Sequence, residues 1–321
     1  MSHGKSLSHK HCKDRDFVTE RNYGEADVLT FMVTKLLITQ NNSSSGRIDK
    51  KKSCGQRIKA VSCSRINTNG IPMKKTVLLL IAALSALVMS CNPSPKHEGP
   101  YPIESFKTPH GHYVNISLIK HGSIAIEYKG TTIQVDPVAA YGKHTDYGKD
   151  FGKAEFVLVT HEHGDHLNDS TILVLSDEKT VLLLNKKSCD MIGHGEAIGN
   201  GETRQLTKDI FLEAVPAYNT TPGHLQYHPK GNGNGYVLTI DGLRIYAAGD
   251  TEDIPEMADL KDIDVAFLPV NQPFTMTPEQ CVNAANMFKP KVLIPYHFSR
   301  TDISGIPAQL PDIDVRLRDM Q

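Results

Sequence analysis

Apolar residues from about residue 115 onward come in short runs separated by polar turns that often contain glycine. This pattern is typical of β-strands. Asp241-Gly242, between two such runs, is a strong hairpin signal. We therefore expect a core built from β-sheets. The runs predicted as strands are residues 115–119, 123–128, 131–135, 156–160, 180–184, 211–217, 236–240, 243–248, 265–270 and 291–295.

Two helices are predicted among these strands. One begins near Leu167. The other covers residues 278–288, because Thr277 is a good N-cap residue, Pro278 suits the first helical position and Gln280 completes a capping box. Early strand meanders followed by alternating strands and helices favour two sheets covered by helices.

The first 90 residues differ in composition from the rest. Residues 1–72 contain 13 Lys and Arg against 6 Asp and Glu, together with three of the six cysteines. Residues 73–90 combine a Lys-Lys pair with an apolar run at 77–89 and a small residue. That combination is typical of a secretory signal peptide, and the run is too short to span a bilayer. The sequence Val-Met-Ser-Cys, ending at Cys91, resembles a bacterial lipobox.

A signal peptide belongs at the front of a protein, so we expect translation to start at Met73 and residues 1–72 to be an over-extended or disordered leader. The competing interpretation makes residues 77–89 an internal core helix. Residues 91–110 are rich in Pro, Gly and Ser, which predicts a tether. Residues 111–321 are predicted to form one domain. The protein is then expected in the bacterial cell envelope, lipid-anchored through Cys91 on the periplasmic or outer-surface side.

The part that follows the signal segment is acidic. From Cys91 onward the chain has 20 Lys and Arg against 30 Asp and Glu, a net charge of −10, although the whole chain carries −1. This argues against generic binding to nucleic acid. Cys189 and Cys281 are the cysteines beyond Cys91, so we expect no disulfide framework, and the sequence does not say whether these two pair.

The densest chemistry lies in the stretch FVLVTHEHGDHL, where an apolar strand is followed by His161, His163, Asp165 and His166. Side chains at i and i+2 of an extended segment point to one side, so His161 and His163 can bind one ion. A bend at the intervening glycine turns Asp165 and His166 toward a second ion. Imidazole and carboxylate suit zinc or a similar divalent metal. A polar loop after a core strand is the alternative, but it needs no such spacing.

Further ligands are expected where later strands end. Asp250 follows the strand predicted at 243–248, and His297 follows the one predicted at 291–295. A turn or helix-capping aspartate and a capping histidine are the plain alternatives. His224 and His228 share one loop, and either could be the remaining histidine ligand.

The pattern H-x-H-x-D-H resembles the signature of the metallo-β-lactamase superfamily, and the resemblance extends from about Ile116 to about His297. It implies an α/β fold, a four-layer αβ/βα sandwich. The sequence His-Pro-Lys-Gly, which begins at His228, resembles the metal-dependent hydrolase branch related to ascorbate-6-phosphate lactonase. The sequence Thr-Pro-Gly-His, which ends at His224, resembles the glyoxalase-type branch. We therefore choose His228 as the ligand and keep His224 as the alternative.

The resemblance also implies the composition of the site. Two divalent ions are expected, with zinc the first choice and manganese or iron compatible. Asp165 and Asp250 are expected to be catalytic, and Asp136 to support a ligand unless it only forms a turn. One ion is assigned to His161, His163 and His228, and the second to Asp165, His166 and His297, with Asp250 between the two.

Substrate contact is expected from Tyr218, Asn219 and Tyr296, for which a purely structural role at strand ends is an equally good interpretation. His121 resembles a His-x-Ser stretch near the start of related domains, where it is either structural or substrate-facing.

Together these features predict a metal-dependent hydrolase that uses a metal-bound hydroxide on a lactone, a phosphodiester or another ester or amide. The expected substrate is a small molecule. The alternative is a non-catalytic, metal-containing envelope binding protein of the same fold. A nuclease is disfavoured by the acidic domain and the export signal, and the sequence leaves the oligomeric state open.

Overall fold

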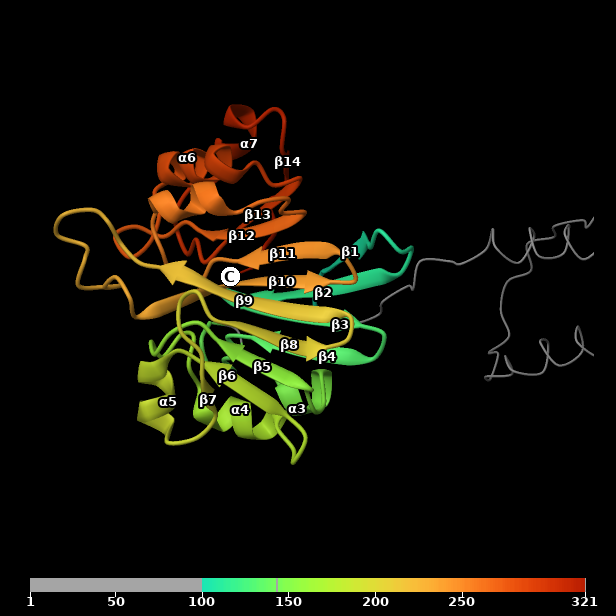
Figure 1. Ribbon diagram of the computed structural model, residues 1–321. Helices are drawn as coiled ribbons and strands as arrows, with labels where there is room; N and C mark the ends of the chain where they lie inside the picture. Colours follow the sequence, from blue (N-terminus) through green and yellow to red (C-terminus); the bar gives the residue numbers. More distant parts are fainter. Residues whose placement is uncertain (1–99, 143, 321) are drawn as a thin grey trace, which may run out of the picture. The chain divides into compact units, whose positions relative to one another are not determined.

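The computed structural model describes residues 100–142 and 144–320, and within them it contains two seven-stranded sheets (Figure 1). The first sheet has the strand order β1-β2-β3-β4-β5-β6-β7 and the second β14-β13-β12-β11-β10-β9-β8. The first comprises β1 (Ile103–Lys107), β2 (Tyr113–Lys120), β3 (Ser123–Tyr128), β4 (Thr131–Val135), β5 (Phe156–Val159), β6 (Val181–Leu184) and β7 (Glu196–Ala197). The second comprises β8 (Thr203–Thr207), β9 (Ile210–Ala217), β10 (Gly233–Ile240), β11 (Leu243–Ala247), β12 (Val265–Pro269), β13 (Val292–Tyr296) and β14 (Asp314–Val315).

Each sheet begins as an antiparallel meander and continues as parallel strands. In the first sheet β1 to β4 pair antiparallel and β4 to β7 parallel. In the second, β8 to β11 pair antiparallel and β11 to β14 parallel. Parallel pairs need crossover connections, and helices occupy them. They are α3 (Tyr147–Asp150), α4 (Asp169–Leu175), α5 (Lys186–Ile192), the 3-10 helix η1 (Pro255–Asp259), α6 (Pro278–Phe288) and α7 (Ile306–Gln309).

The core has three apolar layers. The central one fills the space between the sheets, with residues such as Ile116, Leu158 and Phe267 from both. A second packs α6, η1 and α7 on the outer face of the second sheet, and a third packs α3 and α4 on the first. Figure 1 shows the helices on the two outer faces with the sheets between them. The predicted four-layer α/β sandwich is therefore confirmed.

Every predicted strand and both predicted helices are present. The helix at 278–288 has the predicted bounds, and its capping box forms between Thr277 and Gln280. The other begins at Asp169, with Asn168 as its N-cap. The elements that the pattern did not predict are short or carry few apolar residues, as in β8 (TRQLT) and the two-residue strands β7 and β14.

Strand β1 corrects the predicted tether at 91–110. It reads IESFK, and it pairs with β2 over its whole length. Phe106 packs against the central core layer, so the folded part begins by Ile103 rather than near residue 111. The predicted leader, the signal peptide and Cys91 lie outside the described residues. Among residues 100–142 and 144–320, no helix has the length and apolarity needed to cross a membrane.

Glu104 in β1 fastens the C-terminal segment to the first sheet. Its carboxylate accepts hydrogen bonds from Arg316 (2.5 Å) and Arg318 (2.6 Å). Beyond them, Met320 is buried in the central core, and its carbonyl accepts a hydrogen bond from the backbone N–H of His121 (2.5 Å). The end of the chain thus holds the turn between β2 and β3 in place.

We expect Glu104→Gln to lower the free energy of unfolding by about 1–2 kcal/mol, because both charge-assisted bonds weaken. The value stays below that of a fully buried pair, since the arginine side chains are 26% and 37% exposed and water screens them. Urea denaturation measures the change. Asp190→Asn, in an exposed pair with Lys186, is the control and should lose clearly less stability. Equal losses in the two variants would contradict a fastening role for Glu104.

Candidate metal centre

Eight potential metal ligands meet at one end of the sandwich, within the part of the chain that the structure describes. Most of them directly follow strands β5, β11 and β13, and the others lie in the β2–β3 turn and the β9–β10 loop. They form two groups, and within each group one ligand atom per residue lies within 4.8 Å of the others. The groups are His161, His163, His228 and Asp250, and His121, Asp165, His166 and His297.

Asp250 lies between the two groups. Its Oδ2 is 3.2 Å from His228 Nε2 and 3.8 Å from His161 Nε2 in one group, and 3.3 Å from His297 Nε2 in the other. Its Oδ1 is 3.3 Å from His166 Nε2. Gly249 permits this placement, because its φ is +65° and a Cβ there would lie 2.7 Å from the Asn234 carbonyl oxygen. One carboxylate therefore faces both groups of histidines.

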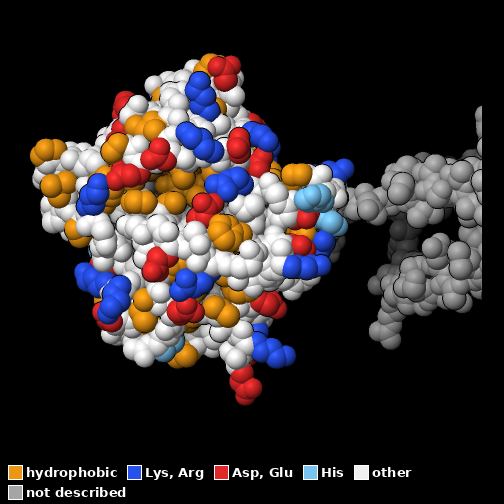
Figure 2. All heavy atoms as spheres, viewed as in Figure 1, with side chains coloured by type: hydrophobic (Ala, Val, Ile, Leu, Met, Phe, Trp, Pro, Cys, Tyr) orange, Lys and Arg blue, Asp and Glu red, His pale blue; other side chains and the backbone are white. Residues whose placement is uncertain are grey.

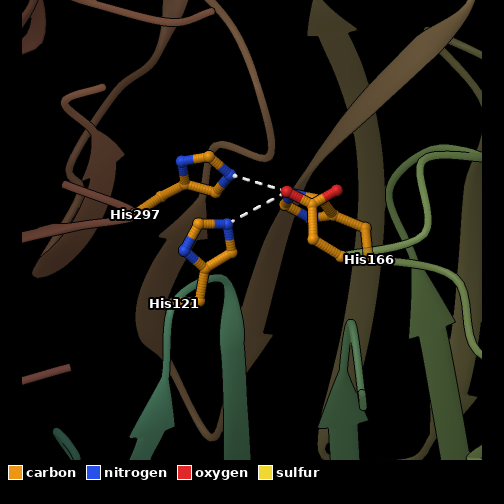
Figure 3. A group of neighbouring side chains, drawn as sticks. His121, His166 and His297 are labelled. Carbon is orange, nitrogen blue, oxygen red and sulfur yellow. Dashed lines mark hydrogen bonds and ion pairs between the residues drawn. The ribbon is translucent and has the colours of Figure 1, made fainter. Parts of the chain in front are cut away.

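The second group is shown in Figure 3, where dashed lines run from His121 and His297 to one carboxylate oxygen. That oxygen is Asp165 Oδ2, at 3.1 Å from His121 Nε2 and 3.6 Å from His297 Nε2. The rings of His166 and His297 are stacked, with centroids 5.1 Å apart. The imidazole rings of His121 and His297 thus point a nitrogen atom at the same carboxylate oxygen.

Several buried atoms of the site have no hydrogen-bond partner among the described residues. They are Nε2 of His166, Nε2 of His228, both ring nitrogens of His297 and Oδ1 of Asp250. Unpaired buried polar atoms are costly, and most buried polar groups in proteins have partners. Nitrogen and carboxylate lone pairs that converge in this way fit divalent cations. The residues present therefore suit a divalent metal ion.

The protonation of these groups also suits a cation. Burial lowers the pKa of His161 well below its ordinary value and that of His121 to about 4, so both rings are neutral at neutral pH and keep a lone pair. Burial alone would raise the pKa of Asp250, but His166 and His297 hold it well below its usual range. The carboxylate is therefore ionised. Burial opposes a charge on His166, yet Asp250 and Asp136 raise its pKa, so a cation that binds its Nε2 must displace a proton.

Asp136 contacts the ring nitrogen of His166 that does not face Asp250. Its Oδ2 accepts a hydrogen bond from His166 Nδ1 (2.7 Å) and another from Thr160 Oγ1 (2.7 Å), while its Oδ1 accepts one from the Thr160 backbone N–H (2.8 Å). Asp136 and His166 are fully buried. This is the supporting position that the sequence predicted for Asp136. Such outer partners fix the tautomer and orientation of a ligating histidine.

The loop between β9 and β10 presents His228, and not His224, to the site. The Phe274 carbonyl accepts a hydrogen bond from His228 Nδ1 (3.0 Å), which leaves Nε2 facing Asp250. His224 lies in neither group, and its Nδ1 is 3.5 Å from Glu252 Oε1. All seven residues predicted as ligands are thus brought together. His121 is the eighth. Sequence reasoning left it without a metal role, and its signals were the resemblance to a His-x-Ser stretch and its place in a Gly-containing turn at the end of an apolar strand.

The three residues predicted to contact substrate make hydrogen bonds within the protein. The Tyr218 hydroxyl donates to Glu256 (2.7 Å), and its ring packs in the outer core layer of the second sheet. The Asn219 amide donates to the Phe274 carbonyl (2.7 Å) and joins two loops. The Tyr296 hydroxyl accepts a hydrogen bond from the Gly249 N–H (2.9 Å). None of the three lines the cavity at the metal centre, and substrate contact by them stays a prediction.

That cavity has a volume of about 390 Å³. Five of the predicted ligands form one part of its wall, and Tyr141, Tyr227, Asn271 and Phe274 form the rest. Sequence reasoning did not single out these four, since they belong to three separate loops. The size falls within the range of small-molecule sites.

Comparison with known proteins agrees with this geometry. Residues 115–297, which include all eight residues of the two groups, match the family model described as "Beta-lactamase superfamily domain". A UPF0173 metal-dependent hydrolase of Thermococcus kodakarensis is 30% identical over 197 residues, which are 58% of this chain and 85% of that protein. A relative of the same name from Pelotomaculum thermopropionicum is 31% identical over 199 residues, again 58% and 85%.

Two solved structures are also similar. One is a protein of Parabacteroides distasonis that has been assigned as a metal-dependent hydrolase. It is 51% identical with a TM-score of 0.66, and the match covers 69% of this chain and 100% of that one. The other is Igni18, a metallo hydrolase from Ignicoccus hospitalis, at 25% identity and a TM-score of 0.55, with 64% and 95% covered.

Proposed function

The chain belongs to the metallo-β-lactamase superfamily, as a metal-dependent hydrolase related to the UPF0173 proteins, and from this premise we propose that it works with two metal ions, zinc being expected. The observation that carries this proposal is the position of Asp250. Its two carboxylate oxygens face two separate groups of histidines, with His161 and His228 on one side and His166 and His297 on the other. A single ion would not need both groups.

Different residues of the chain have different roles in such a site. Divalent ions supply a nucleophile at neutral pH, by lowering the pKa of bound water, and they polarise a substrate oxygen. Asp165 and Asp250 contribute two negative charges against the charge of the ions, so the centre stays positive and attracts a polarised or anionic group. Asp136 orients His166, and the Phe274 carbonyl orients His228. The cavity beside them holds a small molecule, for which we propose a lactone, a phosphodiester or another ester or amide.

The cellular setting is part of the proposal. The signal-like residues 73–90 and the lipobox that ends at Cys91 support export and lipid anchoring in a bacterial cell envelope. The His-Pro-Lys-Gly sequence at His228 supports a relation to ascorbate-6-phosphate lactonase-like hydrolases.

Metal analysis of the purified full chain tests the proposal. We expect two ions per chain, and we expect hydrolysis of an ester, lactone or phosphodiester to be abolished by a chelator and restored by added metal. His228→Ala should weaken metal binding by more than roughly 10–100-fold, the cost of losing only an outer partner of a ligand. His224→Ala removes a histidine from the same loop and should bind both ions normally.

Equal metal content in the two histidine variants would remove His228 from the site. One ion per chain with full activity would disprove the two-metal centre, and chelator-resistant hydrolysis would disprove the mechanism.

A further inference from the structure

The cavity wall away from the ligands is aromatic, and no lysine or arginine among the described residues lines it. We infer that the substrate is an uncharged carboxylic ester or lactone with an aromatic or other flat apolar group beside the scissile bond. Phe274, Tyr227 and Tyr141 are the residues that hold this group. The inference rests on the proposed hydrolase function and narrows its substrate class.

The aromatic side chains are placed to receive a flat group. The rings of Tyr227 and Phe274 lie 5.0 Å apart in an edge-to-face arrangement. Tyr141, from the segment after β4, packs its ring 4.3 Å from that of His121. Phe274 and Tyr141 are 43% and 41% exposed, so both rings leave apolar surface open at the cavity wall. Exposed aromatic rings at the wall of a cavity favour an apolar ligand that would cover them.

Two of these aromatic residues are connected through the backbone to a predicted metal ligand. The Phe274 carbonyl accepts hydrogen bonds from His228 Nδ1 (3.0 Å) and from Asn219 Nδ2 (2.7 Å). Tyr227 directly precedes His228 in the chain. Phe274 and Tyr227 are therefore both connected directly to His228, one by a hydrogen bond and the other by the chain itself, so a group that stacks on them lies beside the metal centre.

The β9–β10 loop carries further apolar surface. Leu225, on the same loop as Tyr227, is 48% exposed. In Figure 2 hydrophobic side chains gather on this loop, which projects from the sandwich in Figure 1. The approach to the cavity on this side is therefore apolar as well.

The distribution of charge disfavours phosphate esters. Arginine and lysine are the side chains that usually bind phosphate oxygens in proteins. Lys230, two residues after His228, instead donates to Glu256 (2.8 Å) and to the Tyr218 hydroxyl (3.0 Å), outside the cavity. Arg300, three residues after His297, is exposed and is not a lining residue. The polar side chains that the wall adds to the ligands are uncharged, namely Asn271 and the hydroxyl-bearing Tyr141 and Tyr227, and the Asn271 amide suits a carbonyl or ether oxygen.

Four substrates with the same leaving group test the inference on the metal-loaded full chain. They are p-nitrophenyl benzoate, p-nitrophenyl acetate, p-nitrophenyl phosphate and bis(p-nitrophenyl) phosphate. We expect chelator-sensitive kcat/KM to be highest for the benzoate. Phe274→Ala should lower kcat/KM for the benzoate by roughly three- to tenfold, mainly through KM, because one aromatic contact is lost. The same variant should change the acetate rate less than about twofold, since the acetyl group has no ring to stack and the p-nitrophenyl ring is common to all four substrates.

Tyr113→Ala is the matched control. Tyr113 is 42% exposed on β2 and does not line the cavity, so its replacement should leave all four rates unchanged. Phe274→Tyr keeps the ring and should keep the preference for the benzoate.

Three results would overturn the inference. If either phosphate ester is turned over faster than the benzoate in a chelator-sensitive reaction, the inferred substrate class is wrong, while the hydrolase function stands. An equal loss on all four substrates in Phe274→Ala would show that Phe274 supports the site without selecting the substrate. If none of the four is hydrolysed, the substrate class is wrong, and a metal-free protein in the same experiment would show that the proposed function has failed with it.

Discussion

Asp250→Asn is expected to lower kcat/KM for chelator-sensitive hydrolysis by at least about 10²–10³-fold while the protein stays folded. The amide keeps the shape of the carboxylate but loses its charge. It also replaces one oxygen, which faces both histidine groups, by an NH₂ group with no lone pair to offer a cation. The Asp250 oxygens lie 3.2 Å from His228 Nε2 and 3.3 Å from the Nε2 atoms of His166 and His297. Losing one preorganised electrostatic contact in an active site already costs about this much.

Steady-state kinetics with elemental analysis of the metal measures both parts of this effect. Asp253→Asn is the matched control, because Asp253 lies three residues farther along, is partly exposed and accepts a hydrogen bond from Asn283 outside the site (2.6 Å). It should retain normal activity and metal content, and circular dichroism should show both variants folded. Wild-type activity and two bound ions in Asp250→Asn would refute a shared role for this carboxylate.

Asp136→Asn is expected to lower the free energy of unfolding by about 3–5 kcal/mol, as for other broken buried pairs, and metal affinity by roughly 10–100-fold. Asp136 accepts hydrogen bonds from three donors, on His166 and on the backbone and side chain of Thr160. An asparagine in the same place turns one acceptor into a donor, so at least one pair of donors is forced to face each other in a fully buried environment. His166 then loses the hydrogen bond that orients its Nε2 toward Asp250.

Urea denaturation and metal titration separate the two effects. Asp264→Asn serves as the control because Asp264 accepts hydrogen bonds from the Arg244 N–H (2.8 Å) and Lys291 (2.7 Å) but lies in neither ligand group. It should lose stability without a change in metal affinity. If Asp136→Asn loses only stability as well, the carboxylate supports the fold and not the metal centre.

The fold could be predicted far into its details because the relevant signals are local. Apolar runs bounded by glycine turns predicted strands such as β3, and Thr277 with Gln280 predicted the start of α6, since each pattern involves residues a few positions apart. The strand β1 shows where this approach ends. Its sequence, IESFK, has few apolar residues, and it forms a strand because β2 pairs with it and Glu104 meets two arginines more than 200 residues away.

The sequence by itself determined the family of ligands, because a strand that ends in His161, His163, Asp165 and His166 leaves few other uses for so many donors. The sequence also named Asp250, His228 and His297, but only the tertiary structure shows that they lie beside this cluster. The placement of His228, rather than His224, next to Asp250 depends on a hydrogen bond to Phe274, 46 positions away. The position of His121 in the second ligand group also depends on how loops from the two sheets meet. The same holds for the hydrogen bond that the Tyr296 hydroxyl accepts from the Gly249 N–H. Local sequence patterns depend on interactions between residues that are close in the chain. The cavity, by contrast, is formed by contacts between segments that only folding brings together.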